Sequence, residues 1–274
     1  MELKIFCPLW GSVELEKEAF IRKVKVAGYD GVEMSLSLDQ NEKASILELI
    51  EKNDLQLIAQ HFETVTPDFN KHKEEFRLRL ENLATANPLI INTQTGKDYF
   101  EFEQNCKLIE IADEVSKEYN VKIIHETHRG KFGFAAHVMA HYLKNFPRLR
   151  IGFDISHWCN VAESFLQDQN EAVELAISRT DHIHARVGFP EGPQVPDPRV
   201  PEWQEALQIH LNWWRKVVEN HQKAGNNLLT ITAEFGPYPY MPILPFTCQP
   251  VTSQWDVNVF MKDLLLDKFQ TVST

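Results

Sequence analysis

Short apolar runs, several of them rich in β-branched residues, recur at fairly even intervals along the chain. They are Leu3–Cys7, Gly31–Met34, Leu55–Ala59, Leu89–Asn92, Val121–His125, Leu149–Phe153, His182–Ala185 and Leu228–Ala233. Runs of this length and composition predict eight β-strands. Near-continuous apolar strands are typical of parallel sheets that are covered by helices.

Longer stretches with helical periodicity lie between these runs. The clearest are Glu14–Ala27, Glu42–Lys52, Phe69–Leu83, Phe102–Tyr119 and Glu202–Lys223. Glycines follow two of them at Gly28 and Gly225, where helix stop signals are expected. A chain in which strands alternate with helices predicts parallel strands joined by right-handed crossovers.

The number of strand–helix units favours a single (β/α)8 TIM barrel over residues 1–274. Eight units in this length match the usual size of such a barrel. A doubly wound open sheet has the same periodicity, so alternation alone does not separate the two folds. No GxGxxG or GxxxxGK motif follows a predicted strand, however, and these are the commonest phosphate-binding loops of open sheets.

Titratable residues gather at the ends of the last four predicted strands. The clusters are His125-Glu126-Thr127-His128-Arg129, Asp154-Ile155-Ser156-His157, His182-Ile183-His184-Ala185-Arg186 and Glu234. In a TIM barrel the catalytic groups come from the C-terminal ends of different strands. The longest interval, between 184 and 234, contains the proline-rich loop 188–199. We expect the segment Pro190–Pro201 to form part of the substrate pocket.

Three carboxylates at one barrel mouth need a compensating charge. Glu126, Asp154 and Glu234 would repel one another if all were ionised. One divalent cation removes this conflict. Three oxygen ligands and one imidazole suit Mn²⁺ first, with Mg²⁺, Co²⁺, Zn²⁺ or Fe²⁺ as alternatives. Strand periodicity points His182 and His184 the same way, and we expect His184 to be the ligand and His182 to pack behind it. Taken singly, Glu126 could instead serve as a helix cap or surface ion pair, and Asp154 as a helix cap.

The motifs at these four strand ends resemble those of the xylose isomerase-like TIM barrels, and within them the sugar (phosphate) isomerase/epimerase branch. The resemblance runs from about Ile5 to Phe260. It implies one divalent cation, held by Glu126, Asp154, His184 and Glu234. It also implies that the two glutamates move protons, that His157 contacts substrate hydroxyls, and that Arg186 clamps the substrate. DNA-repair members of the superfamily, similar to endonuclease IV, carry Asp-x-His where this chain has Asp197-Pro198-Arg199, which argues against a trinuclear nuclease.

Other residues near strand ends are candidate substrate contacts. His128 follows Glu126 at the strand period and is expected to face the substrate. His61 and Glu33 are either substrate contacts or buried structural residues. Trp10 and Trp158 either form an apolar wall for a sugar face or pack in the core.

Charge and composition limit the partners. The net charge of −11 argues against binding to nucleic-acid phosphates or anionic lipid. No apolar run approaches the ~18 residues of a membrane span, and the four cysteines form no CxxC pair. The N-terminal segment lacks the pattern of a signal peptide. We therefore expect a reduced, cytoplasmic protein that binds a small carbohydrate but neither nucleic acid nor membrane. Homo-oligomerisation is left open.

These features predict a metal-dependent isomerase or epimerase acting on a small sugar or keto-polyol. One glutamate would remove the proton next to the carbonyl, giving an enediolate, and the other would return it. The alternatives are a lyase or dehydratase of the keto-inositol type and a non-catalytic, metal-bearing carbohydrate-binding barrel. The scarcity of Lys and Arg in the clusters, beyond Arg129, Arg186 and Arg199, favours an unphosphorylated substrate.

Overall fold

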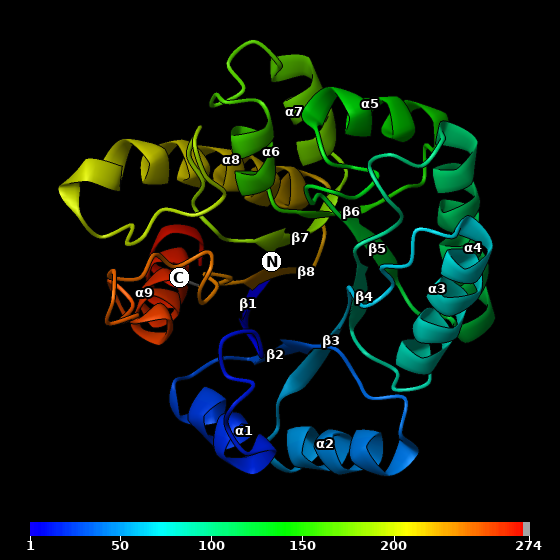
Figure 1. Cartoon of the computed structure of the whole chain (residues 1–274), viewed down its shortest axis with the longest axis horizontal. Helices are drawn as coiled ribbons and strands as arrows, with labels where there is room; N and C mark the ends of the chain where they lie inside the picture. Colours follow the sequence, from blue (N-terminus) through cyan, green and yellow to red (C-terminus); the bar gives the residue numbers. More distant parts are fainter. Residues whose placement is uncertain (271–274) are drawn as a thin grey trace.

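Eight parallel strands form a closed barrel in the computed structural model, which describes residues 1–270 (Figure 1). The strands are β1 Glu2–Pro8, β2 Gly31–Met34, β3 Gln56–His61, β4 Ile90–Thr93, β5 Ile123–Glu126, β6 Ile151–Phe153, β7 Thr180–His184 and β8 Leu228–Thr232. Each strand pairs with the next one in the chain, and β1 pairs with β8 to close the barrel. The predicted TIM barrel and its eight strands are confirmed. Residues 271–274 of the predicted domain lie outside the described residues.

Helices surround the barrel (Figure 1). They are α1 Lys17–Val26, α2 Gln40–Lys52, α3 Phe69–Ala84, α4 Phe102–Tyr119, α5 Ala136–Asn145, α6 Ser156–Val161, α7 Asn170–Ile177, the short 3-10 helix η1 Pro201–Trp203, α8 Gln204–Lys223 and α9 Gln254–Phe269. Asp39, Asp68 and Ser253 cap α2, α3 and α9 by accepting backbone N–H bonds. No helix within residues 1–270 has both the length and the apolarity to cross a membrane.

The barrel interior changes from apolar to polar along the strands. Phe6, Ile58, Ile90 and Ile124 form a small buried cluster, separate from the larger core between strands and helices. Two residues further along β3, β4 and β5, the next position on the same side of each strand is polar. These positions are Gln60, Asn92 and Glu126, all buried. The strand period thus places an apolar layer beneath a buried polar layer at the C-terminal ends of the strands.

Candidate metal centre

Four predicted site residues converge at the C-terminal ends of four successive strands. Glu126 ends β5, Asp154 directly follows β6, His184 ends β7 and Glu234 lies two residues after β8. One ligand atom of each lies within 4.8 Å of the others, and all four residues are buried. The structure therefore brings together the four residues that the sequence singled out as candidate ligands.

The contact between His184 and Glu234 fits a metal site better than a hydrogen bond. His184 Nδ1 lies 2.8 Å from Glu234 Oε2 and 3.6 Å from Glu126 Oε1. Despite the short distance, neither Nδ1 nor that oxygen has an aligned hydrogen-bond partner within the described chain. Buried polar atoms without a partner are costly, so they indicate a missing ligand. Three carboxylates and an imidazole form a donor set that suits a divalent cation.

The charges of these side chains depend strongly on one another. Burial alone, the largest single effect, would raise the pKa of Glu126, but the proximity and charge of His184 and the charge of His128 together lower this pKa to about 2. Burial alone would lower the pKa of His184, but Glu234, Glu33 and Glu126 together raise it well above its usual value. A protonated His184 thus stands among carboxylates in a position where a cation could replace its Nδ1 proton.

Both carboxylate oxygens of Asp154 already have partners, with which a bound cation would share them. Its Oδ1 accepts a hydrogen bond from the backbone N–H of Ser156 at 3.0 Å, and its Oδ2 forms an ion pair with Arg186. Burial raises the pKa of Asp154 despite the opposing charge of Arg186. Arg186 also lies 3.6 Å from Glu234. The guanidinium therefore offsets part of the negative charge at this centre.

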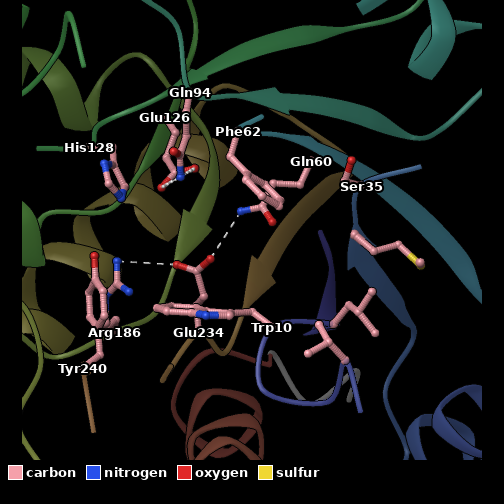
Figure 2. Close-up of a pocket in the computed structure, with 13 residues that line it drawn as sticks. Trp10, Ser35, Gln60, Phe62, Gln94, Glu126, His128, Arg186, Glu234 and Tyr240 are labelled. Atoms are coloured by element: carbon pink, nitrogen blue, oxygen red, sulfur yellow. Dashed lines mark hydrogen bonds and ion pairs between the residues drawn. The ribbon is translucent and has the colours of Figure 1, made fainter. Parts of the chain in front are cut away.

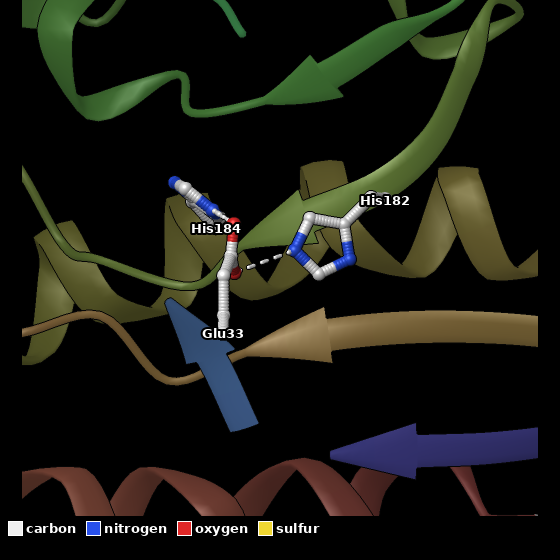
Figure 3. A group of neighbouring side chains, drawn as sticks. All are labelled: Glu33, His182 and His184. Atoms are coloured by element: carbon white, nitrogen blue, oxygen red, sulfur yellow. Dashed lines mark hydrogen bonds and ion pairs between the residues drawn. The ribbon is translucent and has the colours of Figure 1, made fainter. Parts of the chain in front are cut away.

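Glu33 of β2 bonds Nε2 of His184, whereas Nδ1 is the nitrogen near Glu126 and Glu234. Figure 3 shows Glu33 between His184 and His182. His184 Nε2 donates to Glu33 Oε1 at 2.9 Å, and Asn92 Nδ2 donates to the same oxygen at 3.0 Å. His182 Nε2 donates to the other oxygen at 3.2 Å, and its Nδ1 lies 2.7 Å from Thr230 Oγ1. Because Nε2 of His184 donates its proton to Glu33, Nδ1 is the nitrogen that remains free to bind a metal. The structure places His184, not His182, beside the carboxylates.

A cavity of about 240 Å³ lies beside this centre (Figure 2). Its size, below the ~300–1,000 Å³ of pockets for drug-sized ligands, suits a small molecule. The lining residues are Leu9, Trp10, Val13, Met34, Ser35, Gln60, Phe62, Gln94, Glu126, His128, Arg186, Glu234 and Tyr240. The predicted contacts Trp10, His128 and Arg186 lie in this lining.

Each glutamate in the cavity lining accepts a hydrogen bond from a glutamine that was not predicted as a site residue (Figure 2). Gln94, just after β4, donates from Nε2 to both carboxylate oxygens of Glu126 at 3.3 and 3.2 Å. Gln60 of β3 donates to Glu234 Oε1 at 3.4 Å. Both glutamines occupy inward positions near strand ends, and this register is the sequence feature that could have identified them as site residues.

Trp10, Arg186 and Tyr240 form a second contact group at the cavity. The Arg186 guanidinium lies 4.8 Å from the Tyr240 ring centre and 5.6 Å from that of Trp10. The two aromatic rings meet edge to face at 4.9 Å. Gly236 permits this packing, because a Cβ there would lie 2.1 Å from the Trp10 ring. Tyr240 belongs to the connection after β8, for which the sequence held no recognisable motif.

Two candidate substrate contacts, His61 and His157, are not among the residues that line the cavity. His61 is fully buried, with Nδ1 2.8 Å from Thr93 Oγ1 and Nε2 2.8 Å from Thr64 Oγ1. His157 is also buried, accepts a hydrogen bond from Arg186 at 2.8 Å and packs against His128, with ring centres 3.9 Å apart. The structure thus assigns His61 to the core, and places His157 behind Arg186 rather than in the lining.

The proline-rich loop after β7 also lies outside the cavity lining, contrary to expectation. Gln194 of this loop exchanges two hydrogen bonds with the backbone of Gly236, at 3.1 and 2.7 Å. The loop therefore supports the β8 connection from outside the cavity. Asp197 pairs with Arg199 at 2.6 Å and joins none of the metal-capable groups within residues 1–270. Trp158 is buried in the core, where its Nε1 donates to Gly133 O at 2.9 Å.

Comparisons with known proteins extend the fold assignment. No family model and no curated protein sequence matches the chain. Among solved structures, it is similar to a D-allulose 3-epimerase from Methylomonas sp. in complex with D-allulose, with a TM-score of 0.62 and 13% identity over 97% of both chains. A xylose isomerase-like TIM barrel protein from Mycobacterium smegmatis, in complex with magnesium, gives a TM-score of 0.62 and 10% identity over 97% of this chain and 96% of that one.

Other similar structures carry different activities. A 3-keto-D-glucoside 4-epimerase from E. coli has a TM-score of 0.58 and 12% identity over 96% of this chain and 100% of its own. Endonuclease IV from Thermus thermophilus has a TM-score of 0.56 and 12% identity over 85% of this chain and 93% of its own. A probable 3-DHS dehydratase from Bacillus anthracis is also similar, with a TM-score of 0.59 and 12% identity over 96% and 98%. At these identities the likeness supports the (β/α)8 barrel fold alone and leaves the reaction open.

Proposed function

We propose that the chain is a divalent-metal-dependent isomerase or epimerase that acts on a small sugar or keto-polyol by proton transfer. One observation carries this proposal: Glu126 and Glu234 belong to the candidate metal centre and also line the cavity beside it. A base that lines the cavity can reach a substrate C–H bond, which proton-transfer chemistry requires. The similarity to two sugar epimerases supports the same reaction class.

The candidate ligands Glu126, Asp154, His184 and Glu234 would hold one cation, with Mn²⁺ our first choice and Mg²⁺, Co²⁺, Zn²⁺ or Fe²⁺ as alternatives. When bound, the cation would polarise the substrate carbonyl and the adjacent hydroxyl, and so acidify the neighbouring C–H. Arg186 would hold a substrate oxygen from the side that faces Trp10 and Tyr240.

The two glutamates would share the proton transfer. One carboxylate takes the proton from the carbon next to the carbonyl, and the electron pair of the broken C–H bond moves toward the carbonyl oxygen. The other glutamate, protonated beforehand from solvent, delivers its proton to the opposite face of the same carbon in an epimerisation. In an isomerisation it delivers this proton to the neighbouring carbon, and the hydroxyl proton passes to the former carbonyl oxygen. Gln60 and Gln94 orient these carboxylates through the hydrogen bonds that their side-chain amide N–H groups donate.

Solvent labelling tests this function. Mn²⁺-loaded protein is incubated in D₂O with D-allulose, D-fructose and methyl 3-keto-β-D-glucopyranoside, and deuterium at the carbon next to the carbonyl is measured by NMR. Label in substrate or product, lost on treatment with a chelator, is the expected result.

The other reactions give different outcomes. Product without deuterium would indicate hydride transfer, and a new conjugated-product absorbance would indicate a dehydratase. Binding of all three sugars with no label would indicate a non-catalytic carbohydrate-binding barrel. Each of these outcomes would contradict the proposed function.

A further inference from the structure

The cavity has two chemically different walls. Every ionisable lining residue comes from β5, β7, β8 or a connection that follows one of them: Glu126, His128, Arg186, Glu234 and Tyr240. The lining residues contributed by β1, β2, β3 and their connections carry no charge, and most are apolar: Leu9, Trp10, Val13, Met34 and Phe62. Since the strands follow one another around the barrel in chain order, the two sets occupy two arcs, which meet where Trp10 packs against Arg186 and Tyr240.

Figure 2 shows part of this division, and it shows Trp10, from the uncharged set, next to Arg186 and Tyr240. His128, Arg186 and Tyr240 stand on one side, whereas Phe62 and Ser35 stand on the other. Glu234 lies between the two sides, bonded to Gln60 and paired with Arg186. A ligand that reaches both glutamates therefore also faces the uncharged arc.

The apolar wall continues onto the outer surface. Val13 and Phe62 line the cavity and are still 65% and 46% exposed. Among large apolar side chains that are exposed within residues 1–270, all except Val26 and Leu78 lie on the connections that follow strands, α6 included. These connections lie at the same end of the barrel as the cavity. Apolar side chains that line a pocket and stay exposed at its rim, as Val13 and Phe62 do, indicate a ligand with apolar groups.

We propose that the substrate is a keto-sugar or keto-polyol that carries an apolar substituent, such as an alkyl or aryl aglycone. Its carbonyl end would lie at the charged arc, and its apolar end along Leu9, Val13 and Phe62. Only the placement of the carbonyl end at the charged arc rests on the proposed function.

The uncharged arc suits a phosphate group poorly. It contributes no cation to the cavity lining. The charge of Arg186, on the opposite arc, is offset by its ion pair with Asp154, which leaves the guanidinium able to donate to a neutral substrate oxygen but less suited to a phosphate. An alkyl or aryl group, in contrast, would lose contact with water against this wall and gain affinity in proportion to the area that it buries.

Binding of a homologous series tests the inference without turnover. Calorimetry on Mn²⁺-loaded protein measures the affinity for methyl, propyl and pentyl 3-keto-β-D-glucopyranosides. We expect affinity to rise about four-fold for each added methylene, which corresponds to ~0.8 kcal/mol per buried CH₂. Val13→Ser and Phe62→Ser should flatten this dependence. Both side chains are partly exposed, so the substitutions should leave folding intact.

Val65→Ser is the matched control. Val65 is 62% exposed, close to the 65% of Val13, and also lies on a connection after a strand, but it does not line the cavity. It should keep the wild-type dependence on chain length. The inference is overturned if affinity does not change with chain length, if Val13→Ser and Phe62→Ser keep the wild-type dependence, or if no probe binds. Chain-length dependence without deuterium exchange in any probe would instead overturn the proposed function and leave the apolar subsite standing.

Discussion

His184 donates a hydrogen bond of 2.9 Å from Nε2 to Glu33, a buried carboxylate from β2. This bond determines which side of the imidazole faces the other ligands, because a nitrogen that donates its proton to Glu33 cannot also bind a metal. The remaining nitrogen, Nδ1, is the one that lies 2.8 Å from Glu234. Glu33 therefore positions a candidate ligand without belonging to the four-residue metal centre.

Replacement of Glu33 by Gln should weaken metal binding by ~10–100-fold, the usual effect of removing an outer partner of a metal-bound histidine. The amide keeps the size of the side chain but removes the charge that fixes the His184 proton on Nε2. Titration with Mn²⁺ measures the change. Thr230→Val is the control, since it removes the partner of His182 Nδ1 and leaves the Glu33–His184 bond in place. Wild-type metal affinity in Glu33→Gln would contradict this positioning role.

The strand period predicted most of the candidate metal centre. All four candidate ligands stand where a strand ends: Glu126, Asp154, His184 and Glu234. Their spacing along the sequence was therefore enough to predict that they lie close together. Gln60 also holds an inward position, but glutamine carries no charge to mark it as a site residue, and the same is true of Gln94. Tyr240 could not be predicted, because its place depends on how a long connection folds back over the barrel.

The least predictable helix is α9. Its buried residues Val257, Met261, Leu265 and Phe269 form one stripe at a spacing of four. Val259, Phe260, Leu264 and Leu266 lie on its other faces and are half-buried. Because apolar residues surround the helix, its sequence shows no amphipathic period. For His61 the sequence left two alternatives open, a substrate contact and a buried structural residue, and the structure shows a buried histidine whose ring nitrogens lie beside two threonines.

Loss of a candidate ligand should remove the bound metal. Asp154→Ala and His184→Ala each delete one donor of the four, so we expect elemental analysis to fall from one ion per chain to a small fraction of that. Asp197→Ala is the control, because Asp197 pairs with Arg199 in the loop after β7. If both ligand variants kept one ion per chain, the proposed metal site would be wrong.

Two buried histidines should make the fold sensitive to mild acid. Burial, the largest cause, lowers the pKa of His61 to about 3 and that of His210 to about 4. Both stay neutral in the folded chain down to those values, whereas the unfolded chain takes up protons below about pH 6.5. The free energy of unfolding should therefore be unaffected by them above about pH 6.5 and fall as the pH decreases toward 4, by up to ~1.4 kcal/mol per pH unit for each histidine.

Denaturant titrations between pH 6 and 4.5 measure this effect. His61→Gln and His210→Gln should each reduce the slope of stability against pH by about one proton, and the double variant by about two. This comparison removes the contribution of the carboxylates, which all four proteins share. If the curves of the variants ran parallel to that of the wild type, the two histidines would not be the groups that titrate.

The proposed proton transfer depends directly on Glu234. Glu234→Gln keeps the shape of the side chain but removes the base, and loss of a positioned base typically slows proton transfer by ~10²–10⁴-fold. We therefore expect exchange of the substrate C–H with D₂O to fall by this amount while substrate binding remains measurable. Because Glu234 is also a candidate ligand, the variant is assayed at saturating Mn²⁺, and its metal content is checked by elemental analysis. Glu202→Gln, at an exposed position on η1, supplies the control for the same chemical change elsewhere. A metal-loaded Glu234→Gln protein that exchanged protons at the wild-type rate would leave Glu126 as the only glutamate in the lining able to act as the base, and the two-glutamate mechanism would be wrong.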